Sequence, residues 1–318
     1  MLSASIPVVD LGDGSPAERA ALLGQSFRAH GFAIVSGHGI APELIERGWA
    51  LARKFFALPE ESKRRFFDPD LAGARGYTPF GREIAKDAAV HDLKEFWHVG
   101  RELEPETLAF LDLPGNVWPN HPAGFQQTFA ELFEGFDRAG EQLLSLIALD
   151  LGLQADWFDD AIENGNSILR LLHYPPLEDA PPGALRAAPH EDINLVTLLL
   201  GAEEAGLELL SPDGEWLAID PPAGALVVNI GDMMQRLTNH VLPSTTHRVR
   251  NPSTERAGKS RYSMPFFVHP RSDFPIETLP ACVSAARPNR YPDPISAGAY
   301  LEERLIEIGL RSDAPAND

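Results

Sequence analysis

The chain has 318 residues, of which 44% are hydrophobic and 23% charged, as in an ordinary folded globular protein. Asp and Glu number 46 against 27 Lys and Arg, so the formal net charge is −19 at pH 7. This charge opposes binding to nucleic acid or to an anionic membrane, because both present negative charge. It also repels anionic ligands, so a site for a dicarboxylate would need arginines of its own.

The single cysteine, Cys282, cannot form an internal disulfide, which fits a reducing compartment. The N-terminal residues 1–11 carry no basic segment, and Pro7 and Asp10 interrupt their apolar run, so we expect no signal peptide. No apolar run reaches the length of a membrane span. We therefore expect a cytoplasmic protein with a small-molecule substrate, whose oligomeric state the sequence leaves open.

The first part of the chain, residues 1–165, predicts a mixed region of helices and strands. Ser15 followed by Pro16 is typical of a helix start. The expected elements are strands at 6–11, 32–35 and 92–98, helices from Pro16 and from Pro42 to about Leu58, a helical turn at 59–67, and a loop from Arg75 to the third strand.

A long amphipathic helix is expected between Phe125 and Leu151, because apolar residues recur there mostly at three- and four-residue steps. Phe129, Phe133 and Phe136 belong to this apolar stripe. Such a stripe is typical of core packing, so we expect the helix to lie against a sheet.

Residues 166–270 change to short β-rich runs separated by proline and glycine. The compact solution for such a set is a jelly roll, or double-stranded β-helix, which makes the fold mainly β with flanking helices (α+β). Residues 271–318 predict a linker, a helix at about 296–308 and a disordered tail, so that the whole chain forms one domain. The expected strands begin at Ile168 and include 195–200, 207–210, 216–219, 225–230, 246–250 and 261–268.

His190 and Asp192 are separated by one residue at what reads as the start of a strand. Alternate side chains of an extended backbone share a face, so the imidazole and the carboxylate are expected to point together. A second imidazole from a neighbouring strand would complete a two-histidine, one-carboxylate site, which leaves open positions on iron(II). A His-x-Asp triplet alone is a weak signal, because satisfied structural pairs also produce it.

The second histidine must be chosen from its surroundings, since the chain has 10 histidines. His247 lies at the beginning of an expected strand, and Arg261 and Ser263 lie on the next one. His240 is the rival, but it follows Thr238-Asn239 in an expected turn, where a solvated histidine is the simpler interpretation. We therefore predict His190, Asp192 and His247 as a metal site.

The chain resembles the isopenicillin N synthase-like branch of the iron(II)/2-oxoglutarate-dependent oxygenases over nearly its whole length. The similarity depends on an ordered series of segments rather than on one motif. These segments are 6–11, 31–40, 76–79, 94–96, 222–232 and 237–239, followed by Ser244 and His247-Arg248-Val249.

The resemblance implies that His190, Asp192 and His247 bind iron(II), and that Arg261 and Ser263 bind the distal carboxylate of 2-oxoglutarate. It also implies an oxidation of a small organic molecule by dioxygen, with release of succinate and carbon dioxide. The reaction type could be hydroxylation, desaturation or ring closure. Independently, arginine offers a planar fork that matches a carboxylate, and alternation places Ser263 on the same strand face as Arg261.

One segment departs from the family pattern, because Leu172 stands where many members carry a hydrogen-bonding asparagine. Tyr174 is retained and is expected to contact 2-oxoglutarate. Alternation places Arg170 on the same face, which makes Arg170 a candidate second cation for the cosubstrate, and places His173 on the opposite face.

Some aromatic and polar residues have no separate spacing argument. Phe266 and Phe267 could wall the site, one facing inward and one outward, while Trp97 and Phe80 are conceivable substrate contacts. Asn229 falls in a family-like segment, but an asparagine at a strand end is more often turn chemistry than catalysis.

The sequence leaves two other functions open. One is an oxidase on the same scaffold that does not use 2-oxoglutarate, or that fragments it. The other is a metal-binding or ligand-binding module without catalysis, although the presence of all three predicted ligands speaks against it.

Overall fold

The computed structural model describes residues 6–71, 73–81, 93–176, 185–201, 206–252 and 257–307. The C-terminal tail that we expected to be disordered lies outside these residues. Within these ranges, no helix combines the length and the apolar character needed to cross a membrane.

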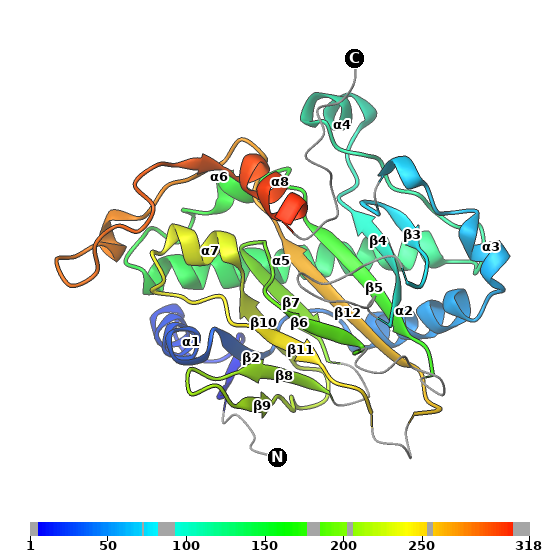
Figure 1. Ribbon diagram of the computed structural model, residues 1–318, viewed down its shortest axis with the longest axis horizontal. Helices are drawn as coiled ribbons and strands as arrows, with labels where there is room; N and C mark the ends of the chain where they lie inside the picture. The colour runs from blue at the N-terminus through cyan, green and yellow to red at the C-terminus, as the bar shows by residue number, and fades with distance from the viewer. Residues whose placement is uncertain are drawn as a thin grey trace.

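Most of the strands form two sheets (Figure 1). The strands of the larger sheet are β1 (Val8–Asp10), β2 (Phe32–Ser36), β3 (Gly76–Thr78), β4 (Glu95–Gly100), β5 (Ile168–Tyr174), β7 (Val196–Leu200), β10 (Leu226–Ile230) and β12 (Arg261–Val268). The smaller sheet contains β6 (Ala187–His190), β8 (Leu207–Leu210), β9 (Trp216–Ala218) and β11 (His247–Val249), and β13 (Pro275–Ile276) pairs with β14 (Ile295–Ser296).

The strand order confirms the predicted jelly-roll core. The eight-stranded sheet runs β1-β2-β10-β7-β12-β5-β4-β3, and the four-stranded sheet runs β6-β11-β8-β9. The N-terminal strand β2 pairs directly with β10 of the second half of the chain, so both halves share one sheet. The helices are α1 (Pro16–His30), α2 (Pro42–Phe56), α3 (Glu60–Arg64), α4 (Pro105–Leu111), α5 (Phe125–Asp150), α6 (Asp159–Ile162), α7 (Asp232–Leu237) and α8 (Ala297–Glu307).

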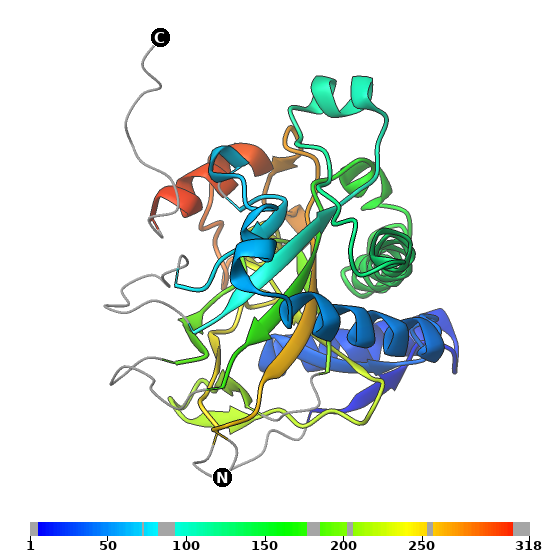
Figure 2. The ribbon, with the colours of Figure 1, turned by 90° about the vertical axis from the view of Figure 1, so that its right-hand side faces the viewer.

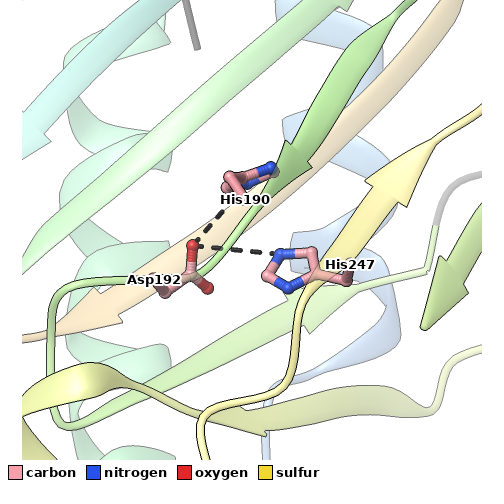
Figure 3. Close-up of side chains that lie close together, drawn as sticks. All are labelled: His190, Asp192 and His247. Atoms are coloured by element: carbon pink, nitrogen blue, oxygen red, sulfur yellow. Dashed lines mark ion pairs between the residues drawn. The ribbon is translucent and has the colours of Figure 1, made fainter. Parts of the chain in front are cut away.

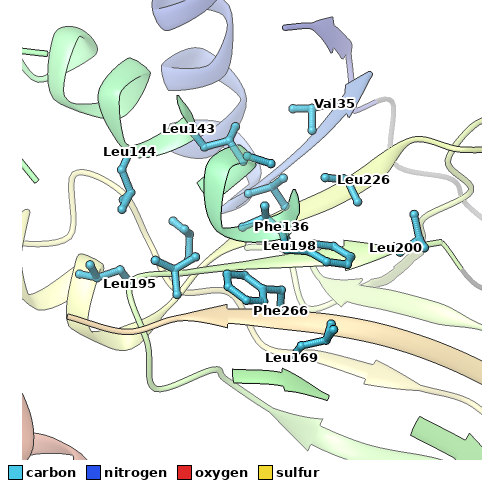
Figure 4. Close-up of a cluster of buried hydrophobic side chains, with 14 of the residues drawn as sticks. Val35, Phe136, Leu143, Leu144, Leu169, Leu195, Leu198, Leu200, Leu226 and Phe266 are labelled. Atoms are coloured by element: carbon cyan, nitrogen blue, oxygen red, sulfur yellow. The ribbon is translucent and has the colours of Figure 1, made fainter. Parts of the chain in front are cut away.

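Helix α5 lies across one face of the large sheet, which we call the outer face (Figure 2). The phenylalanine stripe of this helix is buried there, and Phe136 stacks on Phe266 of β12 with 5.5 Å between ring centroids. Leu169, Leu198 and Leu226 reach the same core from three other strands of the sheet (Figure 4). The outer face therefore holds the main hydrophobic core.

The opposite face, which we call the inner face, carries the polar residues of the same strands. On β5, Leu169 and Leu171 belong to the outer core, whereas Leu172 and Tyr174 pack with Phe96 in a separate inner cluster. This alternation follows from the pleat, which points successive side chains to opposite faces.

Several short elements were not predicted from the sequence. Strand β3 lies in the segment that was expected to be a loop, and its pairing with β4 comes from tertiary contact rather than from an apolar pattern. Helices α4, α6 and α7 contain at most seven residues each, too few for a helical periodicity to be recognised. Part of the expected loop, residues 82–92, lies outside the described chain.

One polar cluster interrupts the apolar outer face. Glu95 of β4 accepts hydrogen bonds from Lys63 Nζ at 2.7 Å and His173 Nδ1 at 2.7 Å, and also from the Tyr77 hydroxyl. Burial alone would raise the pKa of Glu95, but the bonds from His173, Lys63 and Tyr77 outweigh it and lower the pKa overall. His173 therefore faces away from the inner face, as alternation predicted.

Candidate metal centre

Two histidines face each other across neighbouring strands of the smaller sheet. His190 is the last residue of β6 and His247 is the first residue of β11, and the antiparallel register pairs the two directly. Asp192 lies in the segment after β6. The His-x-Asp step thus ends a strand instead of entering one, which corrects our prediction, because β6 stops pairing at His190.

The three side chains converge (Figure 3). His190 Nε2 and His247 Nε2 are each 3.9 Å from Asp192 Oδ1, and one ligand atom from each residue lies within 4.8 Å of the others. The Nδ1 atom of His190 donates to the carbonyl of Ala188 at 2.8 Å, and that of His247 donates to the carbonyl of Thr245 at 3.2 Å. These bonds leave both Nε2 lone pairs directed at a common point, as metal ligation requires.

Two neutral donors orient the Asp192 carboxylate. Thr197 Oγ1 donates to Asp192 Oδ2 at 2.5 Å, and Asn229 Nδ2 donates to the same oxygen at 2.8 Å. Both donors lie on inner-face positions of neighbouring strands, where Thr197 of β7 is in register with Asn229 of β10. Thr197 was not predicted from the sequence. Asn229 lies in a family-like segment, but the sequence favoured turn chemistry for it, whereas the structure shows it donating to Asp192.

The ionisation of the cluster suits a divalent metal. Burial, followed by the charge of His247, lowers the pKa of His190, so its imidazole is neutral at pH 7. Burial acts to raise the pKa of Asp192, but His247, His190, Asn229 and Thr197 together lower it, so the carboxylate is ionised. A neutral imidazole at His190 and an ionised carboxylate at Asp192 are the protonation states in which these groups bind metals.

The rival histidine lies elsewhere. His240 adopts a positive φ of 63° after α7, and its Nε2 is 2.6 Å from the Tyr291 hydroxyl. Its ring stacks on Tyr291 at an interplanar angle of 8°. The predicted turn is present, but the ring is packed and hydrogen-bonded rather than simply solvated.

The predicted cosubstrate residues gather at another part of the inner face. Arg261 of β12 is in register with Tyr174 of β5, and its guanidinium lies 5.1 Å from the centre of the Tyr174 ring. Arg261 Nη1 donates to Ser263 Oγ at 3.3 Å, and both side chains are buried. A buried arginine beside a hydroxyl is suited to a carboxylate.

The aromatic residues that the sequence offered as possible pocket walls or substrate contacts do not share one face of the large sheet. Phe267 faces inward and lies 5.2 Å from the guanidinium of Arg170, while Phe266 packs in the outer core. Trp97 is fully buried in that core against Phe55 and is therefore not a substrate contact. Phe80 is 45% exposed.

Two family profiles match this chain. The sequence profile of the 2OG-Fe(II) oxygenase superfamily matches residues 165–270, and the profile described as non-haem dioxygenase in morphine synthesis N-terminal matches residues 6–121. A 2-oxoglutarate-Fe(II) type oxidoreductase of Emericella nidulans is 33% identical over 293 residues, covering 87% of this chain and 82% of the relative.

Two solved structures are similar over almost the whole chain. A 2OG-Fe(II) oxygenase family protein from Caulobacter crescentus has 47% identity and a TM-score of 0.89, covering 96% of this chain and 100% of that one. A full-length Neurospora crassa protein, solved in complex with alpha-KG and thymine, has 31% identity and a TM-score of 0.84, covering 94% and 96%.

The chain therefore belongs to the 2OG-Fe(II) oxygenase superfamily, in its isopenicillin N synthase-like branch. Its activity is that of an iron(II)- and 2-oxoglutarate-dependent dioxygenase, an oxidoreductase that uses dioxygen.

Proposed function

We propose that His190, Asp192 and His247 hold the iron(II), and that Arg261, Ser263 and Tyr174 bind 2-oxoglutarate during oxidation of a small organic molecule. The observation that carries the proposal is the convergence of three ligand atoms within 4.8 Å of one another. Bound iron(II) would supply open coordination positions and the redox chemistry that couples 2-oxoglutarate and dioxygen to substrate oxidation.

The protein's own residues have separate tasks in this scheme. The Nδ1 bonds of His190 and His247 hold both rings with Nε2 toward the metal. Thr197 and Asn229 occupy one oxygen of Asp192, which supports metal binding through the other. A set of two histidines and one carboxylate would leave coordination positions for cosubstrate and dioxygen.

The cosubstrate pocket depends on Arg261 and its neighbours. Arg261 would bind the distal carboxylate, with the Ser263 hydroxyl adding a hydrogen bond and Tyr174 packing beneath the guanidinium. Leu172 packs with Phe96 and Tyr174 and forms part of the apolar wall, where the family pattern would place an amide. The positive charge of Arg261 offsets the repulsion that a chain of net charge −19 exerts on a dicarboxylate.

The substrate class, domain organisation and compartment are also proposals. A small organic substrate is supported by the thymine complex of the Neurospora relative. A single catalytic domain, with residues 166–270 as its core, is supported by the pairing of β2 with β10. A reducing cytoplasmic location is supported by the lone Cys282, which is buried.

The metal assignment can be tested by anaerobic titration of iron(II) into the parent protein, His247→Ala and His240→Ala. We expect His247→Ala to lose iron affinity, and His240→Ala to bind like the parent because His240 contacts Tyr291 instead. Equal affinity of His247→Ala and the parent would contradict the assignment. Aerobic incubation with 2-oxoglutarate should then yield one succinate per oxidised product, which separates this activity from an oxidase that does not consume 2-oxoglutarate.

A further inference from the structure

The segment that carries Asp192 lies beyond the strand pairing that holds its neighbour His190. Strand β6 ends at His190, which is in register with His247 of β11. The register of this pair of strands already shifts between His247 and Val249. Residues 191 and 192 belong to no strand, so the ladder does not fix the distance between Asp192 and His247.

A side-chain hydrogen bond joins the two ligand-bearing segments at this point. Glu191 lies between His190 and Asp192, and Thr246 directly precedes His247. Thr246 Oγ1 donates to Glu191 Oε1 at 2.6 Å, across 55 residues of sequence. Hydrogen bonds to a carboxylate are short and strong, so this contact can restrict both segments. We call it the Glu191–Thr246 bridge.

The donor end of the bridge is anchored in the smaller sheet. The backbone N–H of Leu210, the last residue of β8, donates to the carbonyl of Thr246 at 2.8 Å. Both Thr246 and Glu191 are partly buried. Because Thr246 is attached to the sheet and Glu191 is not, the bridge holds the segment of Glu191 in place rather than the reverse.

A second contact holds the same segment from helix α7. The backbone N–H of Asp232 donates to the carbonyl of Asp192 at 2.7 Å. The carboxylate of Asp232 in turn pairs with Arg304 of α8 at 3.2 Å. The backbone of Asp192 is thus attached to α7, while the Glu191–Thr246 bridge attaches its segment to β11.

The charges around Glu191 favour a positioning role over attraction of a cation. Burial acts to lower the pKa of Arg304, but nearby acidic groups, among them Asp232 and Glu191, raise it overall. Arg304 therefore offsets part of the negative charge of Glu191. Less of that charge remains to attract a cation at the metal centre.

We propose that the hydrogen bond between Glu191 and Thr246 positions the metal ligands, in place of the strand pairing that stops at His190. This inference rests on the proposed function. The bridge fixes the carboxylate of Asp192 relative to the imidazole of His247, and ligand atoms must keep such a spacing to bind one metal ion. Glu191 acts from outside the ligand set, since it is not one of the three side chains whose ligand atoms converge in the described part of the chain.

The first experiment separates positioning from charge. Iron(II) is titrated anaerobically into the parent protein, Thr246→Val and Glu191→Gln. Thr246→Val removes the donor and keeps the negative charge, whereas Glu191→Gln removes the charge and keeps an acceptor oxygen. We expect Thr246→Val to lose iron(II) affinity about 10-fold and Glu191→Gln to stay within about threefold of the parent. Parent affinity in Thr246→Val, or a loss in Glu191→Gln as large as that in Thr246→Val, would overturn the inference.

Two further variants control for the substitution itself. Thr246→Ser retains a hydroxyl donor and should bind iron(II) within about threefold of the parent. Thr107→Val makes the same side-chain change on α4, away from the metal centre (Figure 1), and should bind like the parent. A loss in Thr246→Ser equal to that in Thr246→Val would contradict a role for the hydroxyl.

Cobalt(II) in place of iron(II) gives a readout of ligand geometry that a change in stability alone would not move. The visible absorption of cobalt(II) depends on the number and arrangement of its ligands. At saturating cobalt(II), we expect the bands of Thr246→Val to differ from those of the parent and those of Thr246→Ser to match them. Identical spectra in all three proteins would overturn the positioning role.

Failure of the proposed function would look different from failure of this inference. In that case the parent protein would bind no iron(II), or His247→Ala would bind it as tightly as the parent. Lost binding in His247→Ala, together with parent-like binding in Thr246→Val, would refute only the Glu191–Thr246 bridge.

Discussion

The two faces of the large sheet use the same strands for different purposes. On the outer face, Leu169, Leu198 and Phe266 are fully buried against the helices. On the inner face, their sequence neighbours Arg170, Thr197 and Phe267 line the region of the site. A one-residue step along a strand therefore leads from a position in the hydrophobic core to a position that faces the proposed site.

This separation has a simple physical origin. A helix covers the outer face, so polar groups there would be buried without water and would need internal partners. The inner face is covered by the smaller sheet at one part, where His247 contacts Phe32, while Arg170 and Phe267 remain partly exposed. Substitutions on the two faces should therefore separate stability from activity.

The largest expected effect is loss of the metal site on the inner side. His190→Ala removes one of the three proposed metal ligands, and we expect succinate formation to fall by at least about 1,000-fold, equal to about 4 kcal/mol. The unfolding midpoint of the metal-free protein should change little, because the side chain of His190 is 36% exposed. Succinate assays measure the loss of activity, and calorimetry of the metal-free forms measures the unfolding midpoint. Retained turnover in His190→Ala would contradict its assignment as a metal ligand.

The adjacent pair Phe266 and Phe267 tests the comparison directly. Phe266→Ala should lower the free energy of unfolding by about 3–5 kcal/mol, since it leaves a cavity beneath Phe133 and Phe136. Phe267→Ala should be much less destabilising because its side chain is partly exposed. Urea denaturation of both variants without metal gives the measurement, and equal losses would show that the two faces are not energetically distinct.

Glu95 is a charged exception on the outer face. Glu95→Gln should lower the free energy of unfolding by about 3 kcal/mol at pH 7, because Lys63 loses its buried counter-charge. The folded pKa of Glu95 lies below its ordinary value of 4.5, so its stabilisation is present above that pH and is lost as the pH falls through the folded pKa.

The difference between the parent and Glu95→Gln should therefore shrink on acidification. Glu134→Gln is a suitable control, since Glu134 forms an exposed ion pair with Arg138 at the long distance of 3.7 Å. Exposed ion pairs contribute little to stability. A difference that stayed constant down to strongly acidic pH would show that the charge of Glu95 does not stabilise the fold.

The smallest expected effect concerns the support of Asp192. Asn229→Ala removes one donor to the carboxylate, and we expect iron(II) affinity to fall about 10- to 100-fold. The neighbouring outer-face change Val228→Ala should instead reduce stability and leave iron affinity near that of the parent. Anaerobic titration of both variants with iron(II) gives the measurement. A larger loss of iron affinity in Val228→Ala than in Asn229→Ala would contradict the supporting role of Asn229.

Sequence periodicity was sufficient for the main elements but not for the short ones. The three- and four-residue repeat of apolar residues marked the segment of α5, and the runs at 207–210 and 261–268 coincide with β8 and β12. Strand β3 and helix α7 were missed because segments this short carry no measurable period.

The amino-acid sequence alone predicted the residue types of the proposed site and, through alternation on β5 and β12, the shared faces of Arg170 with Tyr174 and of Arg261 with Ser263. It also favoured His247 over His240, through its place in an ordered series of family-like segments. Alternation gives the face of a strand residue but not its distance from residues on other strands. The sequence therefore could not show that Arg170 lies four residues along β5 from Tyr174, the residue in register with Arg261.

Only the tertiary structure decided which side chains are neighbours. The antiparallel register placed His247 opposite His190, and Thr197 beside Asn229 at the Asp192 carboxylate. It also placed Arg170 against His98 and Phe267. Strand pairing joins residues far apart in the chain, and such contacts depend on the packing of the whole sheet rather than on any local pattern.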